Sequence, residues 1–155
     1  MEIVRASLAQ ISDARLLLEE YYEAVDVVKR DSPEEIAGYL SDEEAGLWIA
    51  YAEGVPVGCV VLRPLLAVEA ATECKRLYVR REFRGRGIAE ALLDAMEEYA
   101  LDRGVGWVYL DSYDDLRAAI RIYLRRGYGA CERYNDNPQA TIFLRKDLRG
   151  AEKIA

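Results

Sequence analysis

The sequence predicts a mixed α/β (α+β) fold, in which a mostly antiparallel central sheet of about seven strands is flanked by four helices. Apolar residues alternate in some segments and recur at helical spacing in others, in the order β-α-α-β-β-β-α-β-α-β-β. Glu53-Gly54 between two apolar runs is typical of a hairpin. A long helix between two later strands is typical of a parallel crossover. The sheet should be antiparallel in its first half, with a parallel pair around the central helix.

The first half of the chain is expected to form three strands and two helices. Residues 3–7 form the first strand, and Ser12 caps a helix over residues 13–28. The run from Asp31 to Glu35 predicts a second helix that ends near Leu40, because proline and acidic residues favour the first helical turn. Residues 47–52 and 55–62 are the two strands of the hairpin.

In the second half, a strand over residues 76–79 leads into a helix from Gly87 to about Leu101. Residues 107–110 form the next strand, and a helix over 116–126 is closed by Gly127. The last two strands are expected at 128–134 and 141–148. No repeat, low-complexity tract or linker interrupts the 155 residues, so one domain over residues 1–155 is expected.

Composition excludes several classes of protein. The apolar fraction of 52% and the charged fraction of 32% are typical of a soluble globular chain. No apolar run approaches the roughly 20 residues that cross a bilayer, and no signal peptide is recognisable, so we expect a cytoplasmic protein that does not bind membranes. Histidine is absent, which excludes a Ser-His-Asp or Cys-His nucleophile and argues against a metal site. The three cysteines, Cys59, Cys74 and Cys131, lack metal-ligand spacing and are expected to be reduced thiols.

Charge is distributed unevenly along the chain. The net charge is −7, which argues against a general nucleic-acid surface. Between Lys75 and Arg86, however, six basic residues accompany one acid, which gives this segment +5 and the remainder −12. A basic segment in an acidic chain indicates one polyanionic ligand.

The basic segment contains a strand–turn–helix junction. A helix N-terminus presents unpaired N–H groups and a partial positive charge, both of which favour phosphate. Gly85 and Gly87 allow positive φ angles and a close approach of ligand to backbone. A dinucleotide fingerprint would require glycine where Glu90 stands, and the Gly-Lys-Ser/Thr of a P-loop is absent. The junction therefore predicts a phosphate-bearing ligand of another kind.

Two blocks of sequence resemble the GNAT family of N-acetyltransferases. Arg84-Gly85-Arg86-Gly87-Ile88-Ala89 matches the family fingerprint Arg/Gln-x-x-Gly-x-Gly/Ala. The strand before it, Lys-Arg-Leu-Tyr-Val, and the downstream block Ile122 to Tyr128 are also similar to the family, as is the element order over nearly the whole chain. The resemblance implies an enzyme that transfers an acetyl group from the cosubstrate acetyl-CoA to an amine by direct attack in a ternary complex, with no metal.

The resemblance also assigns cofactor contacts residue by residue. The backbone N–H groups of the turn would bind the pyrophosphate: Arg84, Gly85, Arg86, Gly87, Ile88 and Ala89. Leu77, Tyr78 and Val79 would contact the pantetheine and acetyl groups. Leu116 stands where the family often carries an asparagine that touches the coenzyme, so that contact is not carried over.

Two residues are the candidates for chemistry. The resemblance places Tyr123 near the coenzyme sulfur, where a protonated phenol could donate to the departing thiolate; the alternative is a core aromatic on the apolar face of its helix. Glu73 is the candidate base, acting through water on the amine; the alternative is a solvated carboxylate at a strand end. Asp111 is the substitute for Glu73. If alternation is unbroken, Glu73 and Leu77 share a face.

The acceptor is not readable beyond a small-molecule or peptide amine. The acidic remainder of the chain favours a cationic acceptor. Candidate lining residues, placed by position, are Tyr21, Tyr22, Tyr113 and Tyr134. Two alternatives stay open: a non-catalytic acyl-CoA-sensing or partner-binding module, and an O-acyltransferase or antibiotic-modifying enzyme. A homodimer also stays open.

Overall fold

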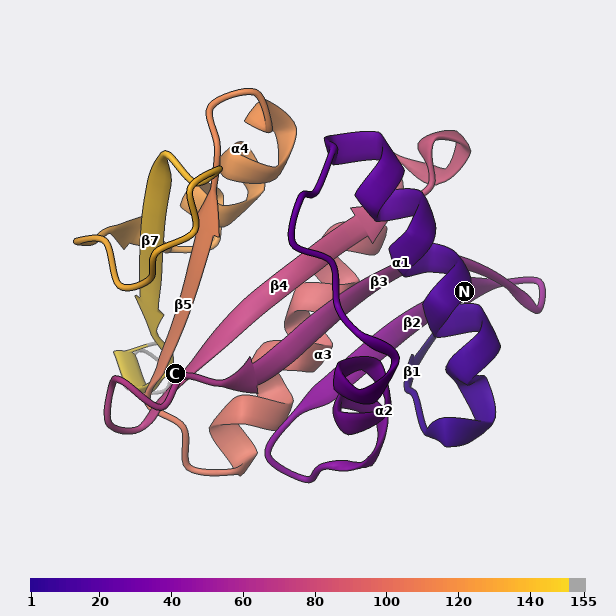
Figure 1. Cartoon of the computed structure of the whole chain (residues 1–155), viewed down its shortest axis with the longest axis horizontal. Coiled ribbons are helices and arrows are strands. Elements are labelled where there is room, and N and C mark those ends of the chain that lie inside the picture. Colours follow the sequence, from indigo (N-terminus) through magenta and orange to yellow (C-terminus); the bar gives the residue numbers. More distant parts are fainter. Residues whose placement is uncertain (151–155) are drawn as a thin grey trace. The chain divides into compact units, whose positions relative to one another are not determined.

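The computed structural model describes residues 1–150 of the chain (Figure 1). The element order is the one that the sequence predicts. The strands are β1 (Glu2–Arg5), β2 (Gly46–Ala52), β3 (Val55–Pro64), β4 (Ala71–Val79), β5 (Trp107–Ser112), β6 (Gly129–Ala130) and β7 (Ile142–Asp147). The helices are α1 (Ile11–Val25), α2 (Pro33–Ser41), α3 (Ile88–Asp102) and α4 (Arg117–Arg125), with 3-10 turns η1 (Leu8–Gln10) and η2 (Arg81–Phe83).

The seven strands form a sheet in the order β1-β2-β3-β4-β5-β7-β6. The pairs β1–β2, β2–β3, β5–β7 and β6–β7 are antiparallel. β4 and β5, which precede and follow α3, are parallel, with Ala71–Glu73 opposite Trp107–Tyr109. The mixed, mostly antiparallel sheet with one parallel pair around the central helix is therefore confirmed.

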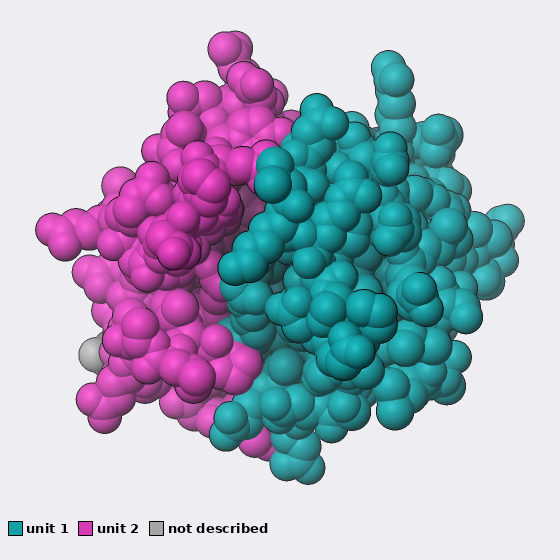
Figure 2. Space-filling view, viewed as in Figure 1, with its two compact units in different colours: residues 1–63, 75–96 teal, residues 64–74, 97–155 magenta. Residues whose placement is uncertain are grey.

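The chain divides into two compact units, which Figure 2 shows in different colours. Unit 1 comprises residues 1–63 and 75–96, and unit 2 comprises residues 64–74 and the chain from residue 97 onward. β4 and α3 each contribute to both units.

The core of unit 1 lies where α1 and α2 cover one face of β2 and β3. Buried side chains come from all four elements, and the fully buried ones include Leu17, Leu18, Leu47, Ile49 and Val61. Cys59 and Val61, which are two positions apart in β3, both belong to this cluster, as period-2 alternation requires. On the other face of β3, the Cα of Gly58 faces Leu92 of α3 and the backbone of β4.

The starts of the first two helices differ in how well they were predicted. The predicted start of the second helix is confirmed, and Ser32 caps it in a capping box with Glu35. Ser12, by contrast, lies inside α1 and is not its cap. Ser7 instead caps η1, and the Gln10 side chain accepts a hydrogen bond from the Ser7 N–H at 2.7 Å. The helical segment therefore begins earlier than predicted. α1 also ends earlier, at Val25, because Asp26 adopts a left-handed conformation.

In unit 2, β5 and β7 pair over six residues each, whereas β6 has only two residues. The predicted strand over 128–134 is therefore mostly wrong. Arg133 donates to the carbonyl oxygens of Asn135, Asn137 and Ala140, and so holds this segment in a loop. Cys131 still donates one backbone bond to Phe143.

β4 is longer than the predicted strand over 76–79, and its alternation is interrupted. Arg76 has a φ of 59°, a left-handed conformation inside the strand. Such a residue rotates the chain and breaks the period-2 pattern, as in a β-bulge. The expectation that Glu73 and Leu77 share a face therefore does not hold.

Two absences concern residues 1–150 only. No helix in this part of the chain is long and apolar enough to cross a membrane. Within the same residues, no group of three or more Cys, Asp or Glu side chains is arranged to hold a metal ion.

Gly58 should be intolerant of any side chain. A Cβ at this position would lie 2.8 Å from the carbonyl oxygen of Tyr78, which is backbone and cannot move freely. We expect Gly58→Ala to lower the free energy of unfolding by about 1–3 kcal/mol. The matched control is Gly38→Ala in α2, where a Cβ meets nothing within 4 Å and should stabilise by about 0.5–1 kcal/mol. Urea unfolding of both variants checks this, and a stable Gly58→Ala would contradict the close approach of β3 to β4.

Candidate active site

The turn between η2 and α3 has the backbone geometry of an anion cradle. Gly85 and Gly87 have φ angles of 78° and 79°, and a Cβ at either would meet nothing within 4 Å. Residues 84–87 are exposed, while Ile88 begins α3 and is buried. The first N–H groups of a helix have no intrahelical acceptor, and α3 is 15 residues long. The turn therefore presents backbone donors to solvent at the positive end of a helix dipole.

The basic side chains around the turn have partners within unit 1. The Arg84 Nε atom donates to the carbonyl oxygen of Val79 at 2.8 Å. The Arg86 guanidinium lies 5.1 Å from the centre of the Phe83 ring. Both contacts join side chains of the turn to residues that precede Gly85. They also leave the backbone, more than the side chains, to face an anion.

The segment from α1 to α2 is bound by three side chains: Arg76 and Tyr78 of β4, and Arg80, which follows β4 directly. Arg80 contacts Glu20 of α1 through both Nε and Nη2, at 2.9 and 2.7 Å. The Tyr78 hydroxyl donates to the same carboxylate at 3.1 Å. These bonds from Arg80 and Tyr78 lower the pKa of Glu20, while burial and Glu20 raise the pKa of Tyr78 to about 12. Arg76 makes the third contact, to Asp31.

Two of the six basic residues counted in the sequence are therefore used inside the protein. Arg76 is paired with Asp31, and Arg80 with Glu20. The segment from Lys75 to Arg86 is a weaker electrostatic attractant than its formal +5 indicates. Sequence alone could not reveal this, because both partners lie more than 40 residues earlier in the chain.

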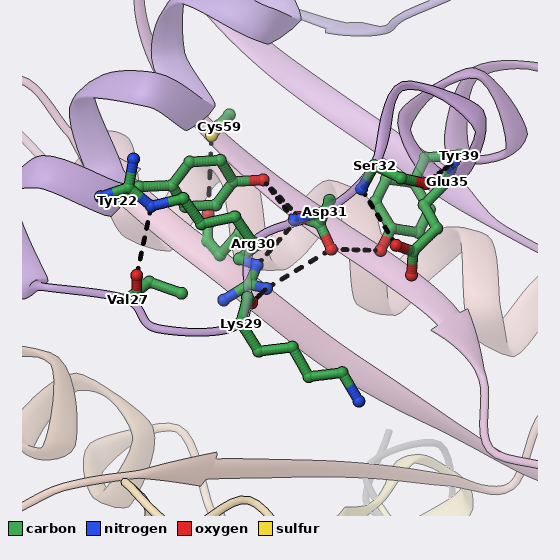
Figure 3. Close-up of polar contacts among 10 residues, drawn as sticks. Tyr22, Val27, Lys29, Arg30, Asp31, Ser32, Glu35, Tyr39 and Cys59 are labelled. Atoms are coloured by element: carbon green, nitrogen blue, oxygen red, sulfur yellow. Dashed lines mark hydrogen bonds and ion pairs between the residues drawn. The ribbon is translucent and has the colours of Figure 1, made fainter.

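The buried contact of Arg76 belongs to a group that we call the Asp31 cluster: Tyr22, Asp31, Tyr39 and Arg76. Figure 3 labels Tyr22, Asp31 and Tyr39 of this cluster. The Asp31 carboxylate accepts from the Tyr22 hydroxyl at 2.6 Å, from the Tyr39 hydroxyl at 2.9 Å and from Arg76 Nε at 3.1 Å. The side chains of Arg76 and Asp31 are 10% and 3% exposed. Burial alone would raise the pKa of Asp31, but the Arg76 charge and the hydrogen bonds lower it on balance.

The Asp31 cluster corrects one expectation and explains a strained residue. Tyr22, a candidate lining residue, is 1% exposed and serves the core and Asp31. A left-handed conformation costs a non-glycine residue about 1–2 kcal/mol. At Arg76 this cost is offset by a desolvated, hydrogen-bonded ion pair.

In unit 2, Glu73 is buried and hydrogen-bonded. It is 2% exposed, and its carboxylate accepts from the Tyr134 hydroxyl at 2.7 Å and from Asn135 Nδ2 at 3.2 Å. The alternative of a solvated strand-end carboxylate is therefore wrong. Burial, followed by the charge of Glu73, raises the pKa of Tyr134 above its ordinary value, so Tyr134 stays a hydrogen-bond donor.

Asp111 lies in the same polar group as Glu73. Asn135 Nδ2 donates to Asp111 at 2.7 Å as well as to Glu73, and Asn137 Nδ2 donates to Asp111 at 3.3 Å. The two candidate bases are thus bridged by one amide. The sequence identified Asn135 and Asn137 as loop residues only. Their Asx-turn pattern was readable, but the distant carboxylates they bind were not.

Tyr123 lies in α4 of unit 2 and is 7% exposed. Its ring packs edge-on against Tyr128, with ring centres 5.8 Å apart. The Tyr128 hydroxyl donates to Glu97, which also binds Arg126 and Lys146 at 3.2 and 2.7 Å. Tyr123 is therefore both a packed aromatic and a phenol held at a fixed place in α4. Cys74 is buried, and burial raises its thiol pKa, which makes it inert.

The candidate residues fall into two groups. Leu77, Tyr78, Val79 and the turn over residues 84–89 belong to unit 1, whereas Glu73 and Tyr123 belong to unit 2. In unit 1, the bond from Arg84 to Val79 joins the turn to the end of β4. In unit 2, the Asn135 side-chain amide bridges Glu73 and Asp111.

Comparison with known proteins identifies the family. The sequence model of the acetyltransferase (GNAT) family matches residues 12–128. The chain belongs to the GNAT family. An uncharacterised N-acetyltransferase of Schizosaccharomyces pombe is 29% identical over 145 residues, which cover 89% of this chain and 88% of the relative. N-acetyltransferase 8B of Rattus norvegicus is 30% identical over 62% of this chain, but the match spans only 45% of that longer protein.

Solved structures show the same fold at low sequence identity. An acetyltransferase of the GNAT family from Staphylococcus aureus has a TM-score of 0.81, with 17% identity over 95% of this chain and 98% of that one. The PaiA N-acetyltransferase of Thermoplasma acidophilum, solved in complex with coenzyme A, has a TM-score of 0.68, with 15% identity over 94% of this chain and 98% of that one. The GNAT fold expected from the sequence is confirmed.

The Asp31 cluster should make stability depend on pH. Its lowered pKa means that Asp31 stabilises the fold above its ordinary pKa of 3.8 and loses that effect as the pH falls through the lower folded-state value. We expect Asp31→Asn to cost about 3–5 kcal/mol of unfolding free energy near neutral pH, because Arg76 is left buried without its partner. The difference from wild type should shrink as the pH falls below 3.8, as chemical unfolding at several pH values would measure.

The matched control is Tyr39→Phe. It removes one donor to Asp31 but keeps the ion pair, so it should cost about 1 kcal/mol and retain the pH dependence. A constant difference between Asp31→Asn and wild type from acid to neutral pH would contradict the ion pair.

Proposed function

We propose that this chain is an N-acetyltransferase that uses acetyl-CoA as acyl donor and an amine as acceptor. The observation that carries the proposal is the exposed turn before α3, in which two glycines with positive φ open the backbone at a helix N-terminus. Membership of the GNAT family and the coenzyme A bound to the related PaiA protein support it. The pyrophosphate would be bound by the backbone of Arg84, Gly85, Arg86, Gly87, Ile88 and Ala89.

The acyl group would be held by β4. In the proposed arrangement, backbone groups of Leu77, Tyr78 and Val79 contact the pantetheine and the acetyl carbonyl. The Val79 carbonyl oxygen is already bonded to Arg84, so the remaining peptide groups of Leu77, Tyr78 and Val79 would make the contacts. An N–H bonded to the acetyl oxygen would stabilise the negative charge that develops during amine attack.

Two side chains would move protons. Glu73 would accept a proton from the amine, through water, because an alkylamine is mostly protonated near neutral pH. Tyr123 would donate to the departing thiolate of coenzyme A. The bonds from Tyr134 and Asn135 would hold the Glu73 carboxylate in a fixed position.

The acceptor is proposed to be a small-molecule or peptide amine. The proposed protein works as one domain in the cytoplasm and binds no nucleic acid, membrane or metal. A homodimer stays open. The acidic remainder of the chain favours a cationic acceptor. The burial of Glu73 keeps a second candidate in view, a non-catalytic acyl-CoA sensor. Free-thiol release from acetyl-CoA with a panel of amines separates the two. Tight acetyl-CoA binding without thiol release for any amine would favour the sensor.

The turn can be tested through Gly87. Alanine at a φ of 79° is strained and would distort the turn, so we expect Gly87→Ala to raise the Kd of acetyl-CoA about tenfold or more, that is by at least ~1.4 kcal/mol. The control is Gly104→Ala, which places the same strain at a φ of 80° after α3 and should leave the Kd unchanged. Isothermal titration measures both, and equal effects of the two variants would argue against the turn as the binding site.

The proton-transfer roles can be tested together. We expect Tyr123→Phe and Glu73→Gln each to lower kcat about 100-fold, since general acid–base catalysis contributes roughly 10²–10⁴. The Kd of acetyl-CoA should change little in either. Raising the pH should partly restore Glu73→Gln, because the free amine then forms without a base, but should not restore Tyr123→Phe. An unchanged kcat in Tyr123→Phe would remove Tyr123 from the mechanism.

A further inference from the structure

Arg76 is the one residue of β4 with a positive φ among those that the structure describes. A glycine would adopt this conformation at no cost, yet the chain carries an arginine here that is bonded to Asp31 and to the Lys29 carbonyl oxygen. The residues directly after it, Leu77 to Val79, are the ones that the proposed function assigns to the acyl donor. The left-handed residue therefore sets the direction in which this segment leaves β4.

Arg76 is held at both its side chain and its main chain. Its Nε donates to Asp31 at 3.1 Å, and its Nη2 donates to the Lys29 carbonyl oxygen at 3.1 Å. Its guanidinium lies 5.4 Å from the centre of the Tyr22 ring. Its own carbonyl oxygen accepts from the Cys59 Sγ atom at 3.5 Å. A rotation of the Arg76 backbone would break contacts on both sides.

The partner of Arg76 is itself fixed. Figure 3 shows the Asp31 carboxylate between Tyr22 of α1 and Tyr39 of α2. The Asp31 N–H also donates to the Tyr22 hydroxyl at 3.1 Å. Asp31 is therefore joined to two helices of the unit 1 core, so the tether ends on a rigid support and not on a loose loop.

The segment after Arg76 is bounded at its far end as well. The Arg80 N–H donates to the Val57 carbonyl oxygen at 2.8 Å. Gly58 permits the Tyr78 carbonyl oxygen to approach β3 closely. Three residues thus run between two fixed points, and their peptide groups can turn only if one of the points gives way.

We propose that Arg76 is a positioning residue for acyl transfer: its tether to Asp31 holds the left-handed conformation in β4 and so orients the peptide groups of Leu77, Tyr78 and Val79 towards the acyl thioester. This inference rests on the proposed function. Arg76 touches neither substrate nor the reacting atoms. Its effect should appear in the rate of acetyl transfer more than in the affinity for coenzyme A, which the turn before α3 would supply.

The test compares Arg76→Ala with Arg76→Gly. Both remove the tether, but glycine accepts a φ near 59° and alanine does not. We expect Arg76→Ala to lower kcat about tenfold or more, with the Kd of coenzyme A changed less than about threefold. Arg76→Gly should recover part of the lost kcat. A purely structural arginine would not produce this order, because both truncations remove the same contacts.

A double-mutant cycle with Asp31→Asn separates the tether from other effects. Asp31→Asn should lower kcat in the wild-type background but change it less than about twofold in the Arg76→Gly background, because the two residues act as one unit. Tyr51→Phe is the control for lost stability. It removes a tyrosine–carboxylate bond of 2.7 Å between β2 and α1, away from β4, and should leave kcat unchanged.

All rates are measured below the unfolding temperature of each variant. If Arg76→Ala does not fold, Arg76→Lys, which keeps the charge, replaces it. Arg76→Lys should have a kcat below that of wild type and above that expected for Arg76→Ala. If wild type turns over and every Arg76 variant keeps a kcat within about twofold of it, the inference is wrong while the proposed function stands. If wild type binds no acetyl-CoA, or releases no thiol with any amine, the proposed function fails and the inference with it.

Discussion

The buried ion pair between Arg76 and Asp31 is the contact on which the geometry of unit 1 depends most. It joins the middle of β4 to the segment between α1 and α2, 45 residues away in sequence. Because Asp31 also binds tyrosines from both helices, one carboxylate sets the relation of three elements. Removing either charge would leave the other buried without a partner, which is far more costly than losing an exposed pair.

This pair also changes how the charge of the chain should be understood. Arg76 and Arg80 neutralise Asp31 and Glu20 inside unit 1, and Arg84 supports the Val79 carbonyl. What the basic segment offers to an anion is therefore mainly the backbone at the start of α3. Backbone binding of an anion needs small residues and a defined turn. The basic side chains are then available for contacts that stabilise the fold.

The sequence predicted the element order, the parallel pair and the start of the second helix, because each has a local signal: periodicity, a crossover helix, or proline and acidic residues in a first helical turn. It failed where a distant contact decides the outcome. The segment after Tyr128 has strand-like residues, but Arg133 binds three carbonyl oxygens and holds a loop. Ser12 resembles a cap, but Ser7 and Gln10 start the helical segment earlier. The left-handed Arg76 has no local signal, since glycine would be the expected residue.

In the candidate site, too, features with a local sequence signal were predicted and those that depend on distant contacts were not. The glycine turn was readable from composition and spacing. The surroundings of Glu73 were not, because Tyr134 and Asn135 lie about 60 residues further along the chain. Of the two interpretations that the sequence allowed for Glu73, a candidate base or a solvated strand-end carboxylate, its burial excludes the second. Tyr123 was placed by resemblance, and its packing against Tyr128 is compatible with both a core residue and a fixed phenol.

The central claim is that backbone N–H groups of one turn and one strand segment bind the acyl donor. The most direct measurement is an NMR titration of the ¹⁵N-labelled chain with acetyl-CoA, following each amide. The account predicts the largest shifts at residues 85–89 and 77–79, with little change at exposed amides of α2. Saturable binding with shifts confined to other segments, and none in the turn, would contradict it.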